Sequence, residues 1–337
     1  MLQPCQDNYS TTFDSYERMR RYHEKESAES LWRRCKVNEL HIEPLDKLSP
    51  LYETPSAFAA GVSRASIEDT AENLGLALQV EGAYYPVRST AYKSLLDRAK
   101  INGTALPKLS RQKLASVLND CLALYSAETL LLIRDEKISA THSGDSMDYS
   151  VLPIDELLKV LTRKLDDRFA GNVFQGGYCD HALAVASWSM PGQKEDLLGA
   201  YAKLLESKKK TALAAKLVPS IRFVTSDTGV ASAKVSAMLE GTQHPIHIGS
   251  CIAVDHRHQS KVEDFETAMV LLTKSRSAPP CQQKKTPTGV IQRVLSSVSG
   301  SMRSPTRGSG PPLPLSLVVK RALSCARASA RKTSPRT

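Results

Sequence analysis

Histidines and acidic residues recur in this 337-residue sequence at positions where strands are expected to end. His256 and His258 are separated by one residue, so on a strand their side chains point to the same side and can chelate one ion. Carboxylates at Asp145 and Asp227 and the imidazole of His181 would complete a metal- or carboxylate-dependent hydrolase site. No H-x-x-x-H helix and no Cys/His set of recognised spacing occurs. We therefore expect surface or hydrogen-bonded histidines and no bound metal, and the hydrolase is the alternative hypothesis.

The tripeptide Asp227-Thr228-Gly229 has the form of the active-site loop of retroviral-type aspartic proteases, in which two carboxylates share one proton. The sequence holds only one copy of this tripeptide. A hairpin turn explains the same residues, with Asp227 accepting local backbone hydrogen bonds and Gly229 supplying a positive φ. We predict the turn.

Signatures of other chemistry are missing. The sequence has no G-x-S-x-G nucleophile motif and neither of the glycine-rich phosphate loops, G-x-x-x-x-G-K-[ST] and G-x-G-x-x-G. We expect no nucleotide or other cofactor, and an enzyme is the less favoured class.

Aromatic and basic residues gather in one stretch that has the composition of a nucleic-acid-binding strand and helix pair. Half-buried tyrosines followed by solvated helix faces explain the same stretch, and this alternative is the favoured one. DNA or RNA is the expected partner if the first interpretation holds. The predicted contact residues are Tyr84, Tyr85, Arg88, Lys93, Arg98, Lys108, Arg111 and Lys113.

The net charge of +10 comes from the end of the chain. Residues 274–337 hold 13 of the 45 Lys and Arg residues and none of the 35 Asp and Glu residues, which leaves residues 1–273 slightly acidic. This tail also lacks Phe, Tyr and Trp. Its composition predicts either a disordered basic tail that binds polyanions or an out-of-frame translation. Net charge is therefore no argument for nucleic-acid binding by the remainder.

Apolar periodicity and capping residues predict the elements that position these side chains. Helices are expected to begin at Ser66, Ser89, Ser110, Pro153, Gln193 and Ser260. Hairpins are expected over 76–87, 129–141, 172–190 and 220–239, with a last strand over 244–254. Hairpins alternating with helices predict an α+β fold, a mainly antiparallel sheet with amphipathic helices packed on it.

Three regions follow from these patterns. Residues 1–55 are charged and irregular, and we predict a loosely attached helical arm and connector there. Residues 56–273 are predicted to form a single globular domain. The seven cysteines contain no C-x-x-C pair, and no secretory h-region or membrane-spanning run occurs, so we expect a cytoplasmic protein with reduced thiols.

Three segments carry a resemblance to a known family: 81–87 (EGAYYPV), 221–235 (IRFVTSDTGVASAKV) and 246–258 (IHIGSCIAVDHRH). They resemble the phage- and plasmid-like proteins of domain of unknown function 932, over about residues 70–273. The resemblance implies a bacterial mobile-element protein, located in the host cytoplasm, with a role in element maintenance or DNA transactions. It assigns no catalytic residue. The first functional hypothesis is therefore a non-enzymatic, nucleic-acid-associated protein.

Overall fold

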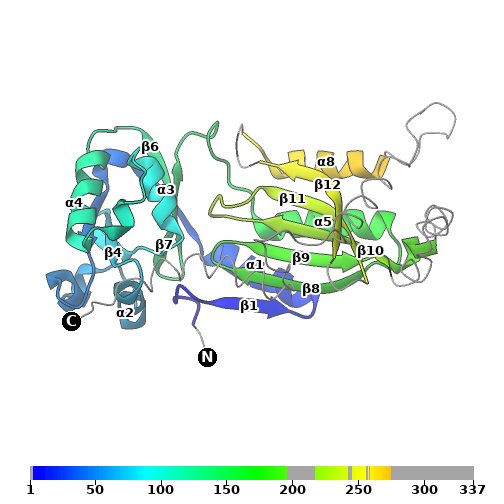
Figure 1. Ribbon diagram of the computed structural model, residues 1–337, viewed down its shortest axis with the longest axis horizontal. Coiled ribbons are helices and arrows are strands. Elements are labelled where there is room, and N and C mark those ends of the chain that lie inside the picture. Colours follow the sequence, from blue (N-terminus) through cyan, green and yellow to red (C-terminus); the bar gives the residue numbers. More distant parts are fainter. Residues whose placement is uncertain (1–2, 196–216, 242–244, 256, 258, 275–337) are drawn as a thin grey trace, which may run out of the picture. The chain divides into compact units, whose positions relative to one another are not determined.

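The computed structural model describes residues 3–195, 217–241, 245–255, 257 and 259–274. It is an α+β structure built from antiparallel sheets and helices, as the sequence predicts (Figure 1). The chain divides into two compact units, and the first comprises residues 1–188, 222–235 and 250–277. All the sites described below lie in this first unit. Among the described residues, no helix is long and apolar enough to cross a membrane.

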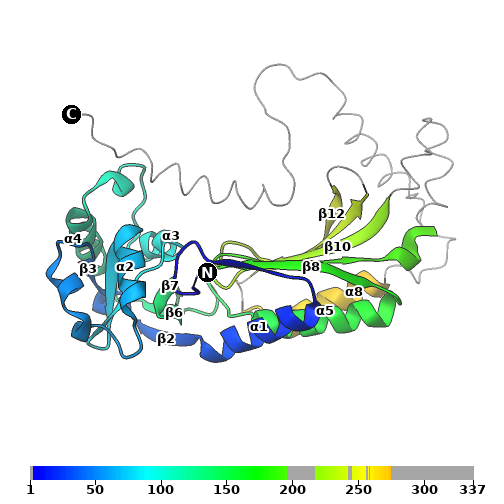
Figure 2. The same cartoon turned by 90° about the horizontal axis from the view of Figure 1, so that it is seen from below.

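One sheet has six strands in the order β1-β8-β9-β10-β11-β12. The strands are β1 Ser10–Phe13, β8 Val173–Asp180, β9 Ala184–Ser189, β10 Val218–Thr225, β11 Ala233–Glu240 and β12 Ile246–Val254. Helices α1 (Tyr16–Glu29), α5 (Ile154–Arg168) and α8 (Val262–Lys274) lie on the same side of β1 and β8 (Figure 2). The buried side chains of α5 are mostly apolar, those of α8 include Phe265 and Met269, and those of α1 are Met19 and His23.

Two smaller sheets complete the first unit. One contains β2 (Leu31–Lys36), β6 (Glu128–Arg134) and β7 (Lys137–Ser143) in that order. The other contains β3 (His41–Pro44), β4 (Leu76–Val80) and β5 (Ala83–Pro86). Three helices lie between strands of these two sheets in the sequence: α2 Arg64–Glu72, α3 Ala91–Arg98 and α4 Arg111–Leu122. Buried side chains of β4, β6, α3 and α4 form one hydrophobic core.

Local signals in the sequence place several elements correctly. The predicted hairpins appear as β4/β5 and β6/β7, and Ser110 caps α4 by accepting a hydrogen bond from the backbone N–H of Lys113. The start of helix α2 differs from the prediction. Helix α2 begins three residues earlier, at the cap Ser63, because Ser63 Oγ accepts a hydrogen bond from the backbone N–H of Ser66. The predicted helix over 193–208 lies largely outside the described residues.

Residues 1–55 differ from the predicted loose arm. Strand β1 pairs with β8, β2 with β6 and β3 with β4, so this segment supplies a strand to each of the three sheets. The charged pattern that indicates an arm arises because β2 leaves Arg33, Arg34 and Lys36 exposed. The predicted tail over 274–337 lies outside the described residues apart from Lys274.

Candidate functional site

A groove of about 570 Å³ opens beside α3 and β7. We call it the α3–β7 groove. Its wall comes from α3 and the residues just after it, from the end of β7 with the following loop, and from the segments around 230 and 256. The side chains most relevant to ligand binding are Lys93, Ser94, Asp97, Arg98, Lys100, Met147, Asp148, Val230, Ser232, Asp255 and Arg257.

Helix α3 is held against β7 by both packing and hydrogen bonding. Ala91 and Leu95 are fully buried on its inner face. On the same helix, Ser94 Oγ accepts a hydrogen bond from the Thr141 backbone N–H at 3.0 Å. This attachment leaves the opposite residues, Lys93 and Asp97, exposed along the groove. The groove therefore has a rigid wall with charged side chains on it.

A stacked aromatic pair lies at the buried end of the groove. The rings of His142 and Tyr149 are 3.5 Å apart and nearly parallel, and both side chains donate hydrogen bonds to the backbone carbonyl of Asp227. Burial, with a contribution from the Asp227 charge, raises the pKa of Tyr149 well above its usual value. Tyr149 is therefore a neutral hydrogen-bond donor that positions the 226–232 segment.

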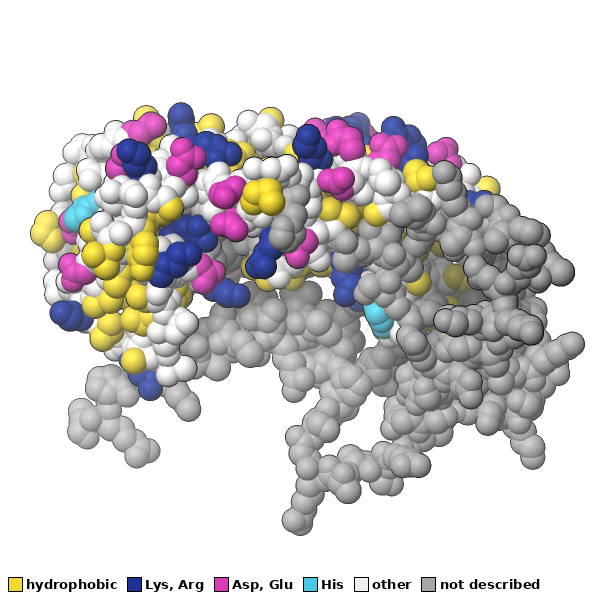
Figure 3. All heavy atoms as spheres, turned by 90° about the horizontal axis from the view of Figure 1, so that it is seen from above, with side chains coloured by type: hydrophobic (Ala, Val, Ile, Leu, Met, Phe, Trp, Pro, Cys, Tyr) yellow, Lys and Arg dark blue, Asp and Glu magenta, His cyan; other side chains and the backbone are white. Residues whose placement is uncertain are grey.

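The charges in the groove are mixed, with a surplus of one positive charge. Four basic side chains and three acidic side chains line it. Burial lowers the pKa of Arg98, and its Nε has no hydrogen-bond partner among the residues that the structure describes. Positive and negative side chains also alternate on the face shown in Figure 3, so its described part carries no broad field of one sign. Met147 and Val230, 48% and 60% exposed, add apolar surface to the groove.

Two of the eight predicted nucleic-acid contacts, Lys93 and Arg98, line this groove. Arg88 was expected on the surface, but it is fully buried and bonded to Ser139 Oγ, so its guanidinium is unavailable to a nucleic acid in this structure. Tyr84 and Tyr85 lie half-buried in β5 and do not line the groove.

The three remaining predicted contacts flank or belong to α4 and also lie outside the groove. Lys108 and Lys113 are exposed, whereas Arg111 donates to the backbone carbonyl of Asn73. The predicted contacts did not include Lys100 or Arg257. Arg257 is distant from α3 in the sequence, and only the fold brings it there.

The predicted hydrolase residues occupy separate structural roles. Asp145 is exposed and accepts a hydrogen bond from the Met147 backbone N–H, which closes a turn. His181 bonds the carbonyl of Gln6 through Nε2, and burial lowers its pKa to about 3, so it is neutral. His256 and His258 lie outside the described residues. The described residues therefore do not assemble this site.

Asp227 lies in the predicted turn, but its carboxylate does not accept the local backbone hydrogen bonds that were predicted for it. Gly229 has φ +72°, as expected. However, the local backbone N–H groups of Thr228 and Val230 donate to Ser226 Oγ instead of to Asp227. The Asp227 carboxylate is nearly buried and pairs with Arg134 at 2.6 Å.

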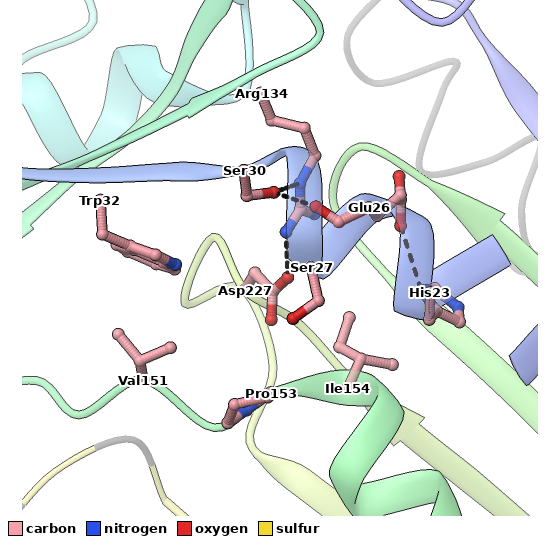
Figure 4. Close-up of a pocket in the computed structure, with 10 residues that line it drawn as sticks. All are labelled: His23, Glu26, Ser27, Ser30, Trp32, Arg134, Val151, Pro153, Ile154 and Asp227. Atoms are coloured by element: carbon pink, nitrogen blue, oxygen red, sulfur yellow. Dashed lines mark hydrogen bonds and ion pairs between the residues drawn. The ribbon is translucent and has the colours of Figure 1, made fainter. Parts of the chain in front are cut away.

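This ion pair belongs to a buried polar cluster that the sequence did not indicate (Figure 4). We call the five side chains His23, Glu26, Ser30, Arg134 and Asp227 the Arg134 cluster, and they line a cavity of about 190 Å³. Arg134 Nε donates to Ser30 Oγ at 2.7 Å, and His23 Nδ1 lies 3.0 Å from a Glu26 oxygen. Its only sequence signal is the three-residue spacing of His23 and Glu26 on α1, which places both on one helix face.

Comparison with family models, curated proteins and solved structures finds no match to this chain. The resemblance to domain of unknown function 932 therefore stays a prediction.

Proposed function

We propose that this chain binds single-stranded nucleic acid in the α3–β7 groove and acts without catalysis, as a component of a bacterial mobile element. The observation that carries the proposal is the position of Lys93, Arg98, Lys100 and Arg257 around one groove that also exposes Met147 and Val230. Proteins that bind single strands combine cations that follow the backbone with flat or apolar surfaces for the bases. The mobile-element origin rests on the family resemblance.

The concave form of the site favours a single strand over a duplex. Duplex readers insert a helix or a β-ribbon into a major groove about 12 Å wide. Here the charged side chains line a groove, which can receive an extended strand. The small surplus of positive charge supports weak to moderate affinity that falls with salt, because three carboxylates oppose the phosphates.

The basic tail makes a separate contribution that any test must distinguish. Its 13 Lys and Arg residues bind polyanions by releasing counterions, whatever the folded part does. The proposal therefore concerns the binding that depends on groove residues.

Replacing the two exposed groove lysines with alanine (Lys93→Ala with Lys100→Ala) tests the proposal. Loss of two exposed ion pairs, each worth about 0.2–1 kcal/mol, weakens binding about two- to thirtyfold. The slope of log affinity against log salt becomes shallower by about 0.7 for each lost phosphate contact. Fluorescence anisotropy with a single-stranded DNA oligonucleotide measures both, in the full chain and in a chain ending at Ser277.

The matched control is Lys108→Ala with Lys113→Ala, which removes two exposed lysines outside the groove. This control is expected to bind like the unmodified chain. The proposal fails if both double variants bind and respond to salt identically, or if the shortened chain does not bind.

A further inference from the structure

Three metal-ligating side chains converge next to the 190 Å³ cavity. They are His23 and Glu26 from α1 and Cys179 from β8, and one ligand atom of each lies within 4.8 Å of those of the other two. His23 and Cys179 are 2% and 3% exposed, and the Glu26 side chain is 12% exposed. The proposed nucleic-acid groove does not include any of these residues.

Helix α1 packs on β8 at this point through the side chain of Met19. A Cβ atom added at Gly177 would lie 2.5 Å from the Met19 sulfur, so only glycine fits beneath the helix without a shift. Met19 is fully buried on the inner face of α1, one turn before His23. The close approach places the His23 and Glu26 side chains over the strand residue Cys179.

Hydrogen bonds leave this cluster incomplete. His23 Nδ1 faces Glu26, but His23 Nε2 is buried and has no hydrogen-bond partner among the described residues. A buried polar atom without a partner destabilises the folded state, so such an atom calls for an explanation.

The charges also leave the cluster incomplete. Glu26 and Asp227 are two carboxylates, and Arg134 is the one guanidinium beside them, already paired with Asp227 at 2.6 Å. A cation bound beside Glu26 would balance the second negative charge.

We propose that His23, Glu26 and Cys179 bind a divalent transition-metal ion, and that zinc is the metal that this ligand set fits best. Thiolate, imidazole and carboxylate together are a borderline-soft set of the kind that zinc takes in proteins. On binding, the Cys179 thiol loses its proton to solvent and the sulfur forms a bond to the metal. Three protein ligands leave a fourth position open, and the cavity that His23 and Glu26 line is large enough for a water molecule there.

Cobalt(II) titration of the purified full chain is the direct test, because a cobalt–thiolate bond has a charge-transfer band in the near ultraviolet. We expect this band with about one ion bound per chain, and its displacement by zinc. Cys179→Ser is expected to lose the band and to bind zinc more than about 100-fold more weakly, beyond the effect of losing an outer-shell partner. Cys5→Ser, which removes another buried cysteine, is expected to retain the cobalt–thiolate band and the affinity for zinc.

A second measurement uses the unmodified protein, in case Cys179→Ser does not fold. Zinc is expected to slow alkylation of Cys179, mapped by mass spectrometry, while Cys5 reacts at an unchanged rate. The proposal is overturned if no cobalt–thiolate band forms, if the band survives in folded Cys179→Ser, or if zinc leaves the two alkylation rates unchanged or slows both equally.

Discussion

At the scale of single residues, two fully buried cations hold the first residues of the chain in place. Lys137 donates to the carboxylates of Asp7 and Asp69, at 3.0 and 2.5 Å. Arg88 reaches the backbone carbonyls of Pro4 and Gln6, each at 3.4 Å. Both side chains are 0% exposed, so breaking either set would leave a buried charge without its partners. These contacts explain why residues 3–9 are an integral part of the first unit.

Asp7 is expected to make stability depend on pH. Burial opposes its charged form, but Lys137 and Arg88 outweigh burial and hold the pKa of Asp7 below its ordinary value of 3.8. A carboxylate with a lowered pKa in the folded state stabilises the protein above the unfolded-state pKa and loses that contribution as the pH falls. Asp7→Asn should therefore cost about 1–3 kcal/mol at neutral pH, and the difference from the unmodified protein should narrow below pH 3.8.

Urea unfolding at several pH values measures this difference. Asp14→Asn is the matched control, because Asp14 is 77% exposed and pairs, within the part of the chain that the structure describes, only with the exposed Arg18. It should change the unfolding free energy by less than about 0.5 kcal/mol. A pH-independent cost for Asp7→Asn would contradict the explanation.

At the scale of elements, the β6–β7 turn also fixes the start of α2. Glu136 lies in this turn with a positive φ of 69°. Its carboxylate accepts hydrogen bonds from the Ser63 backbone N–H at 2.8 Å and from Ser63 Oγ at 2.6 Å, and also from Ser66 Oγ. Burial opposes the charged form, but these donors hold the pKa of Glu136 below its usual value. One side chain thus joins a hairpin to a helix cap.

Glu136→Ala should lower the free energy of unfolding by about 1–3 kcal/mol, since three donors around Ser63 and Ser66 lose their acceptor. Glu81→Ala is the control, because Glu81 has a similar φ of 51° in the β4–β5 turn and is exposed. Thermal or urea unfolding of the two variants measures the contrast. Equal effects would show that the turn conformation matters and the hydrogen bonds do not.

Local patterns in the sequence predicted these elements better than their long-range partners. The leucine spacing and Ser110 cap of α4, and the Asp135-Glu136 turn between β6 and β7, are properties of short segments, and the structure confirms them. Residues 1–55 were misjudged because β1 and β2 pair with strands far along the chain. The exposed charges of β2 hid its role as a strand.

Contacts between residues distant in the sequence also limit what the sequence predicted about the sites. Lys93 and Arg98 could be singled out because they are close together on one helix, and both line the groove. Arg88 could not be recognised as buried, because its partner Asp7 is distant in the sequence. The proposed metal ligands His23, Glu26 and Cys179 could not be grouped from the sequence either, because they meet only through the packing of α1 against β8.

At the scale of the whole first unit, Asp227 connects the α3–β7 groove to the Arg134 cluster. The Asp227 backbone carbonyl accepts hydrogen bonds from His142 and Tyr149 at the end of the groove, and its carboxylate pairs with Arg134. The 226–232 segment, which carries Val230 into the groove wall, is therefore fixed from both sides. This rigidity suits a preformed binding surface.

The position of bound nucleic acid tests the central claim most directly. A single-stranded oligonucleotide with a photoreactive uracil can be crosslinked to the full chain, and the linked peptides identified by mass spectrometry. We expect crosslinks in peptides that contain Met147 or Val230, the two exposed apolar residues of the groove. Crosslinks confined to the peptide with Tyr84 and Tyr85, or to residues 274–337, would contradict the assignment of the α3–β7 groove.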